Sequence, residues 1–190
     1  MCSQYFLELK MLMEMEDKID YLFELELQKR ITYFPGNQIP VIKMDDHQLT
    51  GDLVKWGYRL FDNKLVINAR SETLNQKALF KNDLIGHRCI IPATGFYEWD
   101  EHKHKFSFEN PQHKLLFMAG IYREFNNQKE VTIITTNANE SMENIHSRMP
   151  LIFDYLQMRD WLENKNIASL LKIQPESLII TSGNLQTSLF

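Results

Sequence analysis

The chain has 190 residues, of which 44% are hydrophobic and 12% aromatic, and its 21 basic and 25 acidic side chains give a net charge of −4. This composition excludes a disordered chain and a strongly basic nucleic-acid-binding protein, and the length favours a single domain over residues 1–190. No apolar run approaches the roughly 20 residues that span a bilayer, no secretory signal is recognisable, and two cysteines are too few for a disulfide framework, so a cytoplasmic protein is expected.

The negative charge is concentrated at the start of the sequence. Residues 1–50 carry 5 basic and 9 acidic side chains, whereas residues 51–150 carry 13 basic and 12 acidic ones together with five of the six histidines. The acidic residues between positions 14 and 26 are typical of a solvated helix face. The middle of the chain can therefore still form a local cationic groove.

The hydrophobic pattern changes from helical to strand-like along the chain. Apolar residues at helical spacing predict a helix over residues 11–29, and a Phe34-Pro35-Gly36 turn signal follows it. Segments rich in β-branched and aromatic residues predict strands at 54–60, 64–68, 89–91, 114–122, 131–136 and 177–181. Helices are expected at 73–80, 154–164 and 166–172. Most of these strands are joined by loops too short for a helical crossover, which indicates an α+β fold with a mixed or largely antiparallel sheet.

Cys2 follows the initiator methionine. If Met1 is removed, Cys2 carries a free α-amine, which titrates at about 7.7–8.0, beside a thiol that titrates at about 8.5. Such an aminothiol can condense with an aldehyde to an imine and close through sulfur to a thiazolidine. Alternatively, its thiolate can attack an acyl carbon with the amine as base, as in N-terminal nucleophile hydrolases. As a third alternative, Cys2 lies in a frayed terminus and has no chemical role. Cys89, the second cysteine, is expected in the core.

A polar string, residues 68–73, directly follows the Leu65-Val66-Ile67 strand. At such a strand end Asn68 can orient an amine or a carbonyl, and Arg70 can hold a phosphate with its planar fork. The structural alternative is helix capping by Ser71 or Thr73 and a surface ion pair for Arg70.

Two further segments carry titratable residues. In Gly95-Phe96-Tyr97-Glu98-Trp99, a carboxylate between aromatic side chains is poorly solvated and suits a proton shuttle, and Trp99 offers a face for a base; an amphipathic strand with an exposed Glu98 is the alternative. In residues 144–150, His146 can act as acid or base and Arg148 as an anion clamp, although a lone histidine is more often structural. The tract of residues 102–105 interleaves His with Lys, so we expect a solvated hairpin loop and no metal.

Taken in order, these segments resemble the SOS response-associated peptidase (SRAP) family of abasic-site processing proteins. The resemblance covers nearly the whole chain and rests on an ordered set of motifs: Met1-Cys2, Trp56-Gly57-Tyr58, Asn68-Ala69-Arg70-Ser71-Glu72-Thr73, Phe80, Arg88-Cys89-Ile90-Ile91-Pro92-Ala93, Gly95-Phe96-Tyr97-Glu98-Trp99, Met118-Ala119-Gly120-Ile121, Thr135-Thr136-Asn137-Ala138-Asn139 and Ile145-His146-Ser147-Arg148-Met149-Pro150. The family usually begins Met-Cys-Gly-Arg, and Gln4 stands here in place of that arginine.

The resemblance implies a fold and a chemistry. The fold is a single α+β domain with a mixed, mostly antiparallel curved sheet or barrel flanked by helices. The chemistry is removal of Met1, by the protein itself, and crosslinking of Cys2 to the ring-opened aldehyde of an abasic site in single-stranded DNA as a thiazolidine. This crosslink would shield the lesion during the DNA damage response, with AP-lyase activity by β-elimination as a chemically available side reaction.

The family's site residues map onto positions of this sequence. The resemblance implies catalytic roles for Cys2, Asn68, Glu98 and His146, and contacts to DNA from Trp56, Arg70, Trp99 and Arg148. It implies no metal or other cofactor, no membrane, and a cytoplasmic monomer that joins the nucleoid at damage. Two other functions stay open on the residues alone: a cysteine amidohydrolase or peptidase that uses Cys2 and His146 on a separate substrate, and a non-catalytic binding module.

Overall fold

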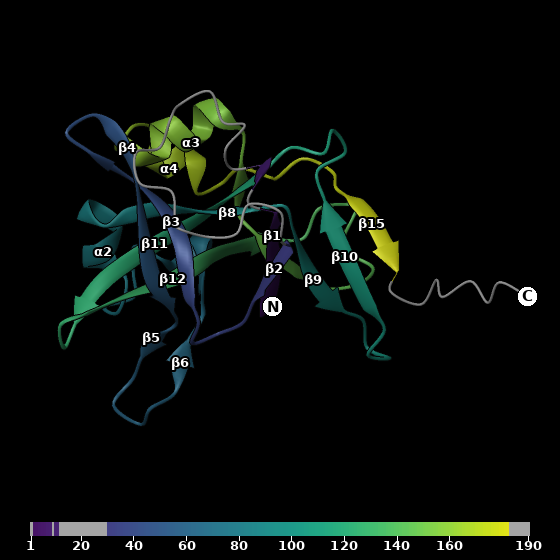
Figure 1. The fold of residues 1–190 in the computed structure, drawn as a ribbon, viewed down its shortest axis with the longest axis horizontal. Coiled ribbons are helices and arrows are strands. Elements are labelled where there is room, and N and C mark those ends of the chain that lie inside the picture. The colour runs from purple at the N-terminus through teal and green to yellow at the C-terminus, as the bar shows by residue number, and fades with distance from the viewer. Residues whose placement is uncertain (1, 9, 12–29, 183–190) are drawn as a thin grey trace, which may run out of the picture.

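The computed structural model describes residues 2–8, 10–11 and 30–182, and Figure 1 shows their arrangement. The helix predicted over residues 11–29 lies outside the described residues beyond Met11. None of the helices in the described ranges is long and apolar enough to cross a membrane.

Five strands close into a barrel at the centre of the fold. They are β3 (Gln38–Asp45), β4 (Gln48–Trp56), β8 (Arg88–Ala93), β11 (Leu116–Phe125) and β12 (Gln128–Asn137). The pairing runs β12–β4–β3–β8–β11 and returns to β12, and each pair is antiparallel except β12 with β4. Closure satisfies the hydrogen-bonding groups of every edge. β12 is buried along seven consecutive residues, as a strand covered on both faces must be.

The second half of β12 serves as a platform for short strands. There it pairs in parallel with β7 (Asn68–Arg70) and antiparallel with β13 (Arg148–Pro150). A hairpin of β5 (Tyr58–Arg59) and β6 (Leu65–Val66) leads from β4 into β7, and β14 (Ile152–Phe153) follows β13 and pairs with β11. Residues 68–70 and 148–150, far apart in the sequence, are thus brought to one end of one strand.

A second, smaller sheet lies beside the barrel (Figure 1). Its order is β15 (Ile179–Ser182), β10 (Lys105–Glu109), β9 (Gly95–Trp99), β1 (Gln4–Glu8) and β2 (Arg30–Tyr33), and all its pairs are antiparallel. Alternate residues of these strands, among them Tyr5, Phe96 and Phe108, are buried in the common core. The Tyr5 ring lies 5.6 Å from the ring of Trp56 in β4, so this small sheet and the barrel share one hydrophobic core.

The helical elements are short and peripheral. They are the 3-10 turn η1 (Ser71–Thr73) and the helices α2 (Lys81–Gly86), α3 (Tyr155–Leu162) and α4 (Ile167–Leu170). Asp154 and Gln157 form a reciprocal capping box at the start of α3. The indole N–H of Trp161 donates to the Cys89 carbonyl at 3.1 Å, which fixes α3 on the barrel strand β8.

The predicted fold class is confirmed, and the differences from the predicted elements have local causes. The strand expected at 54–60 divides because Gly57, at φ +116°, turns the chain between β4 and β5. The helix expected at 73–80 is wrong. Leu74 and Phe80 are both buried but lie six residues apart, a spacing that one helix would place on different faces. The chain there turns after η1, and α2 begins only at Lys81.

Candidate active site

Cys2 lies just before β1 and is completely buried. Its thiol is 3.9 Å from the Gln4 carbonyl oxygen. Burial raises the pKa of this thiol well above its ordinary value, and the negative charge of Glu98 raises it further. A thiol in this setting stays protonated at neutral pH and needs a nearby base before it can act as a nucleophile.

Asn68, at the start of β7, reaches Cys2 across 66 residues of sequence. Its Nδ2 donates to the Cys2 carbonyl oxygen at 3.0 Å. Its Oδ1 is buried and has no hydrogen-bond partner in the described part of the chain. Parallel pairing of Asn68 with Ile133 in β12 fixes the position of this side chain. One half of the amide therefore holds the Cys2 backbone, and the other half is an acceptor that can take a new donor.

Glu98 is in β9, which is the neighbour of β1 in the small sheet. Gln4 pairs with Tyr97, and continuing this antiparallel register carries the chain from Gln4 back towards Cys2 alongside Glu98 and Trp99. The Glu98 side chain points to the core side and is 3% exposed, whereas Trp99 is only partly buried. The alternative of an exposed Glu98 is therefore wrong, and a buried carboxyl lies within electrostatic reach of the thiol.

His146 directly precedes β13. Its Nδ1 accepts the backbone N–H of Arg148 at 2.9 Å. Nδ1 also lies 3.0 Å from the Arg148 carbonyl oxygen, so these contacts fit either tautomer of the imidazole. In the tautomer that carries the proton on Nε2, Nδ1 accepts from the Arg148 backbone and the half-buried ring has Nε2–H as its donor.

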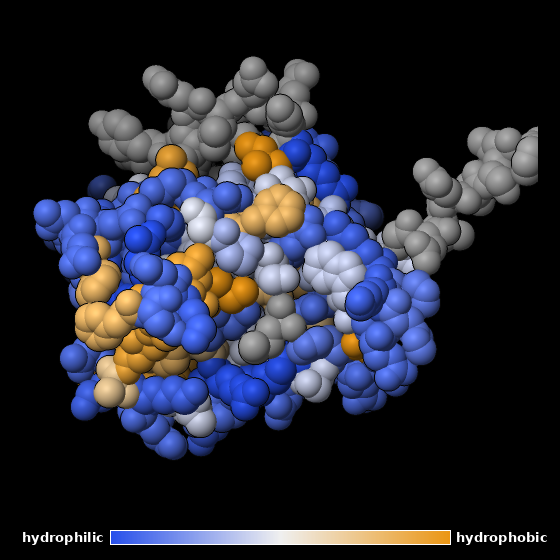
Figure 2. Space-filling model, turned by 90° about the horizontal axis from the view of Figure 1, so that it is seen from below, coloured by the Kyte–Doolittle hydropathy of each residue, from blue (hydrophilic) through white to orange (hydrophobic). Residues whose placement is uncertain are grey.

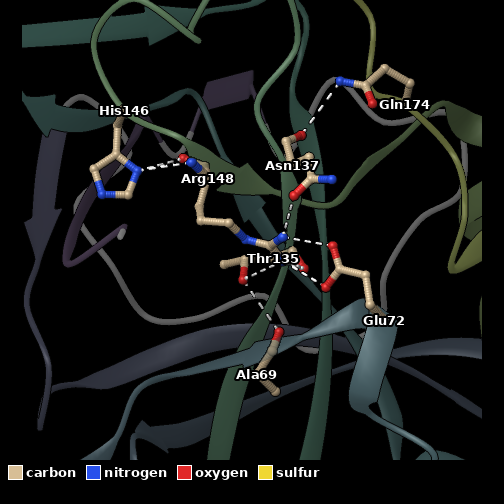
Figure 3. Close-up of polar contacts among 7 residues, drawn as sticks. All are labelled: Ala69, Glu72, Thr135, Asn137, His146, Arg148 and Gln174. Carbon is tan, nitrogen blue, oxygen red and sulfur yellow. Dashed lines mark hydrogen bonds and ion pairs between the residues drawn. The ribbon is translucent and has the colours of Figure 1, made fainter.

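Arg148 holds the strands around the site together (Figure 3). Its guanidinium donates to Glu72 at 2.6 and 3.0 Å, to Asn137 Oδ1 at 2.7 Å and to the Thr135 carbonyl at 2.7 Å. The residue is 8% exposed. The guanidinium is thus occupied by protein acceptors that link η1, β12 and β13. A DNA contact by Arg148 stays a prediction, and in this arrangement the fork that would hold a phosphate holds Glu72.

Arg70 and Trp56 differ in their exposure to solvent. Arg70 is exposed, and no side-chain hydrogen bond is found for it within the described residues, so its fork is available to an anion. Trp56 is 0% exposed, packs on Tyr5 and donates its indole N–H to the Ile67 carbonyl at 3.0 Å. A DNA contact by Trp56 stays a prediction; in this structure the ring is buried and supports the segment that leads into Asn68.

Two parts of the site were not singled out from the sequence. No role was predicted for Glu72, which lies within residues 68–73, or for Asn137. Both side chains accept hydrogen bonds from the Arg148 guanidinium. The only signal was an acid two residues after Arg70, which gives no hint of a partner 76 residues away. Residues 102–104 lie in the hairpin loop between β9 and β10, as predicted, and His104 Nδ1 lies 2.9 Å from Asp100 Oδ2. Lys105, predicted in the same loop, is instead the first residue of β10 and pairs with Trp99.

One face of the protein is mixed in polarity. Figure 2 shows apolar atoms gathered on the left of the face seen from below, the side on which the β5–β6 hairpin lies in Figure 1. Phe61, at the tip of this hairpin, is fully exposed.

The candidate active site combines a buried nucleophile, Cys2, an amide that holds its backbone, Asn68, and a buried carboxyl, Glu98. Such a set suits addition to a carbonyl carbon with transfer of protons, and it needs no metal ligand.

Residues 1–182 match the profile of the family described as SOS response associated peptidase (SRAP). The chain is 33% identical over 183 residues to the abasic site processing protein YoqW of Bacillus subtilis, which covers 87% of this chain and 82% of that protein. It is 28% identical over 155 residues to the abasic site processing protein YedK of Escherichia coli, covering 77% of this chain and 70% of that one.

A solved structure supports the fold independently. The crystal structure of a protein from Bordetella bronchiseptica superposes with a TM-score of 0.81 at 22% identity, covering 97% of this chain and 100% of that chain. At this level of identity the match concerns the fold: the barrel with the small sheet beside it is an architecture that another chain also adopts.

Proposed function

Because the chain belongs to the SOS response associated peptidase (SRAP) family, we propose that it processes abasic sites in single-stranded DNA through a covalent bond from Cys2. The observation that carries the proposal is the convergence of Asn68 and Glu98 on Cys2. Strands β7 and β9 and the segment before β1, all distant in the sequence, supply these residues. The Asn68 side chain binds the Cys2 backbone, and the charge of Glu98 raises the pKa of the Cys2 thiol. Nothing in a simple structural role requires this combination.

The first step is removal of Met1 by hydrolysis of the Met1–Cys2 peptide bond. The methionine carbonyl carbon gains the oxygen of water, and the α-nitrogen of Cys2 leaves with a proton. Glu98 is the proposed proton carrier, because its buried carboxyl lies within electrostatic reach of Cys2. The new α-amine adds a donor beside Asn68, whose buried Oδ1 lacks a partner in the described structure and can accept from it.

Crosslinking then proceeds in two bond-forming steps. The α-amine adds to the ring-opened aldehyde of the abasic sugar, and loss of water gives an imine. The Cys2 sulfur adds to the imine carbon, its proton passes to the nitrogen, and a thiazolidine ring closes. His146 donates its Nε2–H to the sugar oxygen as the sugar ring opens. The imine also acidifies the C2′ protons, so that β-elimination, an AP-lyase reaction, is open to the same intermediate.

Two accessible side chains are the proposed DNA contacts beside Cys2. Arg70, exposed next to Asn68, is the proposed phosphate contact at the lesion, and Trp99 offers an aromatic face beside Glu98. On this proposal the chain acts as a monomer in the cytoplasm, at the nucleoid when DNA is damaged. The covalent bond rather than a basic surface retains it there, which agrees with a net charge of −4.

A denaturing gel tests the proposal directly. Purified protein is mixed with a single-stranded oligonucleotide that carries one abasic site. We expect a slow-migrating band with the wild type and with Cys89→Ala, the matched control at the second cysteine, and no such band with Cys2→Ala or with undamaged DNA. Absence of the band from the wild type, or its persistence in Cys2→Ala, overturns the proposal. Intact-mass measurement of the purified chain should show loss of one methionine.

A further inference from the structure

The face of the small sheet that points away from the core carries a continuous row of aromatic and cationic side chains. Cross-strand partners share a face of a sheet. Glu8 pairs with Arg30, Gln4 with Tyr97 and Trp99 with Lys105, which places all these residues on one face. The residues between them, such as Phe96 and Glu98, point to the opposite, buried face.

The members of this row are stacked on one another. The Lys105 ammonium lies 3.6 Å from the centroid of the Tyr97 ring and 5.5 Å from that of Trp99. The Tyr97 and Phe6 ring centroids are 5.0 Å apart, and the Arg30 guanidinium lies 3.5 Å above Phe6. We call these five residues, Phe6, Arg30, Tyr97, Trp99 and Lys105, the cation–aromatic strip. It crosses β2, β1, β9 and β10 as one unit, which Figure 1 shows side by side.

The positive charges of the strip are poorly compensated. Within the described residues Lys105 has no carboxylate at ion-pair distance, and Arg30 has only Glu109, at 3.8 Å. The acids of the nearby turn are engaged elsewhere, since Asp100 binds His104 and Glu101 lies 3.5 Å from His102. Partial burial and the positive charge of Arg30 lower the pKa of Lys105. Two cations that repel each other over apolar rings favour an anion with more than one charge.

The strip leads directly into the candidate active site. Trp99 follows Glu98 in β9, and Gln4, on the same face as Tyr97, is two residues from Cys2. A chain of phosphates with planar bases matches both features of the strip, because phosphates pair with cations and bases stack on aromatic rings and on guanidinium groups. The strip runs diagonally across the sheet from Lys105 in β10 to Arg30 in β2. Along β1 it lies on one side of Cys2, because Tyr97 is level with Gln4 and Arg30 is level with Glu8.

We propose that the cation–aromatic strip binds the single-stranded DNA on one side of the abasic site, with Lys105 and Arg30 on backbone phosphates and Trp99 against a base. The inference rests on the proposed function for its choice of ligand. It adds a binding track that sets how a flanking strand approaches Cys2.

Binding of undamaged single-stranded DNA tests the strip without any crosslinking. Fluorescence anisotropy with a labelled thymidine oligonucleotide is measured at several salt concentrations for the wild type, Lys105→Gln and Arg30→Gln. Each lost phosphate contact should lower the slope of log affinity against log salt by about 0.7, which is about a fivefold loss at 0.1 M salt. Lys165→Gln, at an exposed position of the α3–α4 connection, is the matched control and should bind as the wild type does. Thermal unfolding checks that the variants are folded.

Wild-type affinity and salt slope in both strip variants overturn the inference. A second arm uses oligonucleotides with an abasic site and a flank on only the 5′ side or only the 3′ side. For each oligonucleotide, the protein concentration that gives half-maximal crosslinking is compared between the wild type and Lys105→Gln. This concentration should rise in the variant with only one of the two oligonucleotides. An equal rise with both contradicts a one-sided track. If the proposed function is wrong, the wild type forms no crosslink, but the binding of undamaged DNA can still be measured. The failure of the proposed function can therefore be told apart from the failure of the inference about the strip.

Discussion

Replacing Arg148 by glutamine removes the guanidinium that joins β13 to β12 and η1. The side chain makes four short hydrogen bonds, two to the Glu72 carboxylate, one to Asn137 Oδ1 and one to the Thr135 carbonyl. Glutamine offers only one NH₂ group, is uncharged and is shorter. The variant therefore cannot replace this set of bonds.

The magnitude follows from what each acceptor can recover. The Glu72 side chain is 42% exposed, so its carboxylate regains water, and the loss of this ion pair costs about 1 kcal/mol. Thr135 is completely buried, so its carbonyl loses a charged donor without access to water, at about 1–3 kcal/mol. We therefore expect the free energy of unfolding to fall by about 3 kcal/mol, which for a chain of this length lowers Tm by about 6–12 °C.

Chemical denaturation and thermal unfolding of Arg148→Gln measure this loss, with Arg70→Gln as the matched control. Arg70 is exposed on the neighbouring strand β7, so its variant should keep the stability of the wild type within about 0.5 kcal/mol while binding DNA less tightly. If Arg148→Gln unfolds like the wild type but loses DNA affinity, Arg148 is a phosphate contact and the structural reasoning is refuted.

Three further substitutions probe the site and its frame. Glu98→Gln should slow Met1 removal or resolution of the crosslink with the fold intact, because it keeps the shape and removes the proton carrier; intact mass and gel time courses measure both, and wild-type rates for both would refute the role. The hydrogen bond from Arg148 lowers the pKa of Glu72, so the stability that Glu72 contributes is present above its unfolded pKa of about 4.5 and is lost as pH falls through the lower folded value. The difference in unfolding free energy between wild type and Glu72→Gln should accordingly shrink below about pH 4.5, and a difference that stays constant down to pH 3 contradicts this. Gly95→Ala should destabilise the chain by about 1–3 kcal/mol, because its Cβ would lie 2.5 Å from Phe6 Cζ and from the Phe108 carbonyl; unchanged Tm would show that the small sheet yields easily.

Local patterns were sufficient for part of the fold. The strand predictions at 89–91 and 131–136 are confirmed within β8 and β12, and the helix predicted at 154–164 is confirmed as α3. These segments carry their own signals: β-branched runs, or a capping residue before an amphipathic stretch. β3 was missed, although Gln38–Asp45 is a long barrel strand, because Pro40 and the mixed residues around it weaken the local pattern. Its pairing with β4 and β8 provides the stability that the local sequence lacks.

Chemistry could be predicted only as a list of residue types. Cys2, Asn68 and Glu98 were singled out because of what their functional groups can do, and tertiary structure brings them together. For arginine and tryptophan the sequence could not predict the surroundings of each side chain. The Trp56 ring is buried and the Arg148 guanidinium is bonded to Glu72, whereas Arg70 is exposed and Trp99 is partly buried.

The composition, the helical and strand periodicities and the ordered motifs are properties of the sequence itself, and they determined the fold class and the family. What only the tertiary structure decided is the environment of each group. The net charge of −4 seemed to disfavour DNA, but folding brings Arg30 and Lys105 to one face of the small sheet. On that face Glu8 binds Lys10, and Glu109 lies 3.8 Å from Arg30. It also buries the Cys2 thiol next to a carboxyl. Burial and charge neighbours depend on which strands pair, and pairing depends on contacts between residues far apart in the chain.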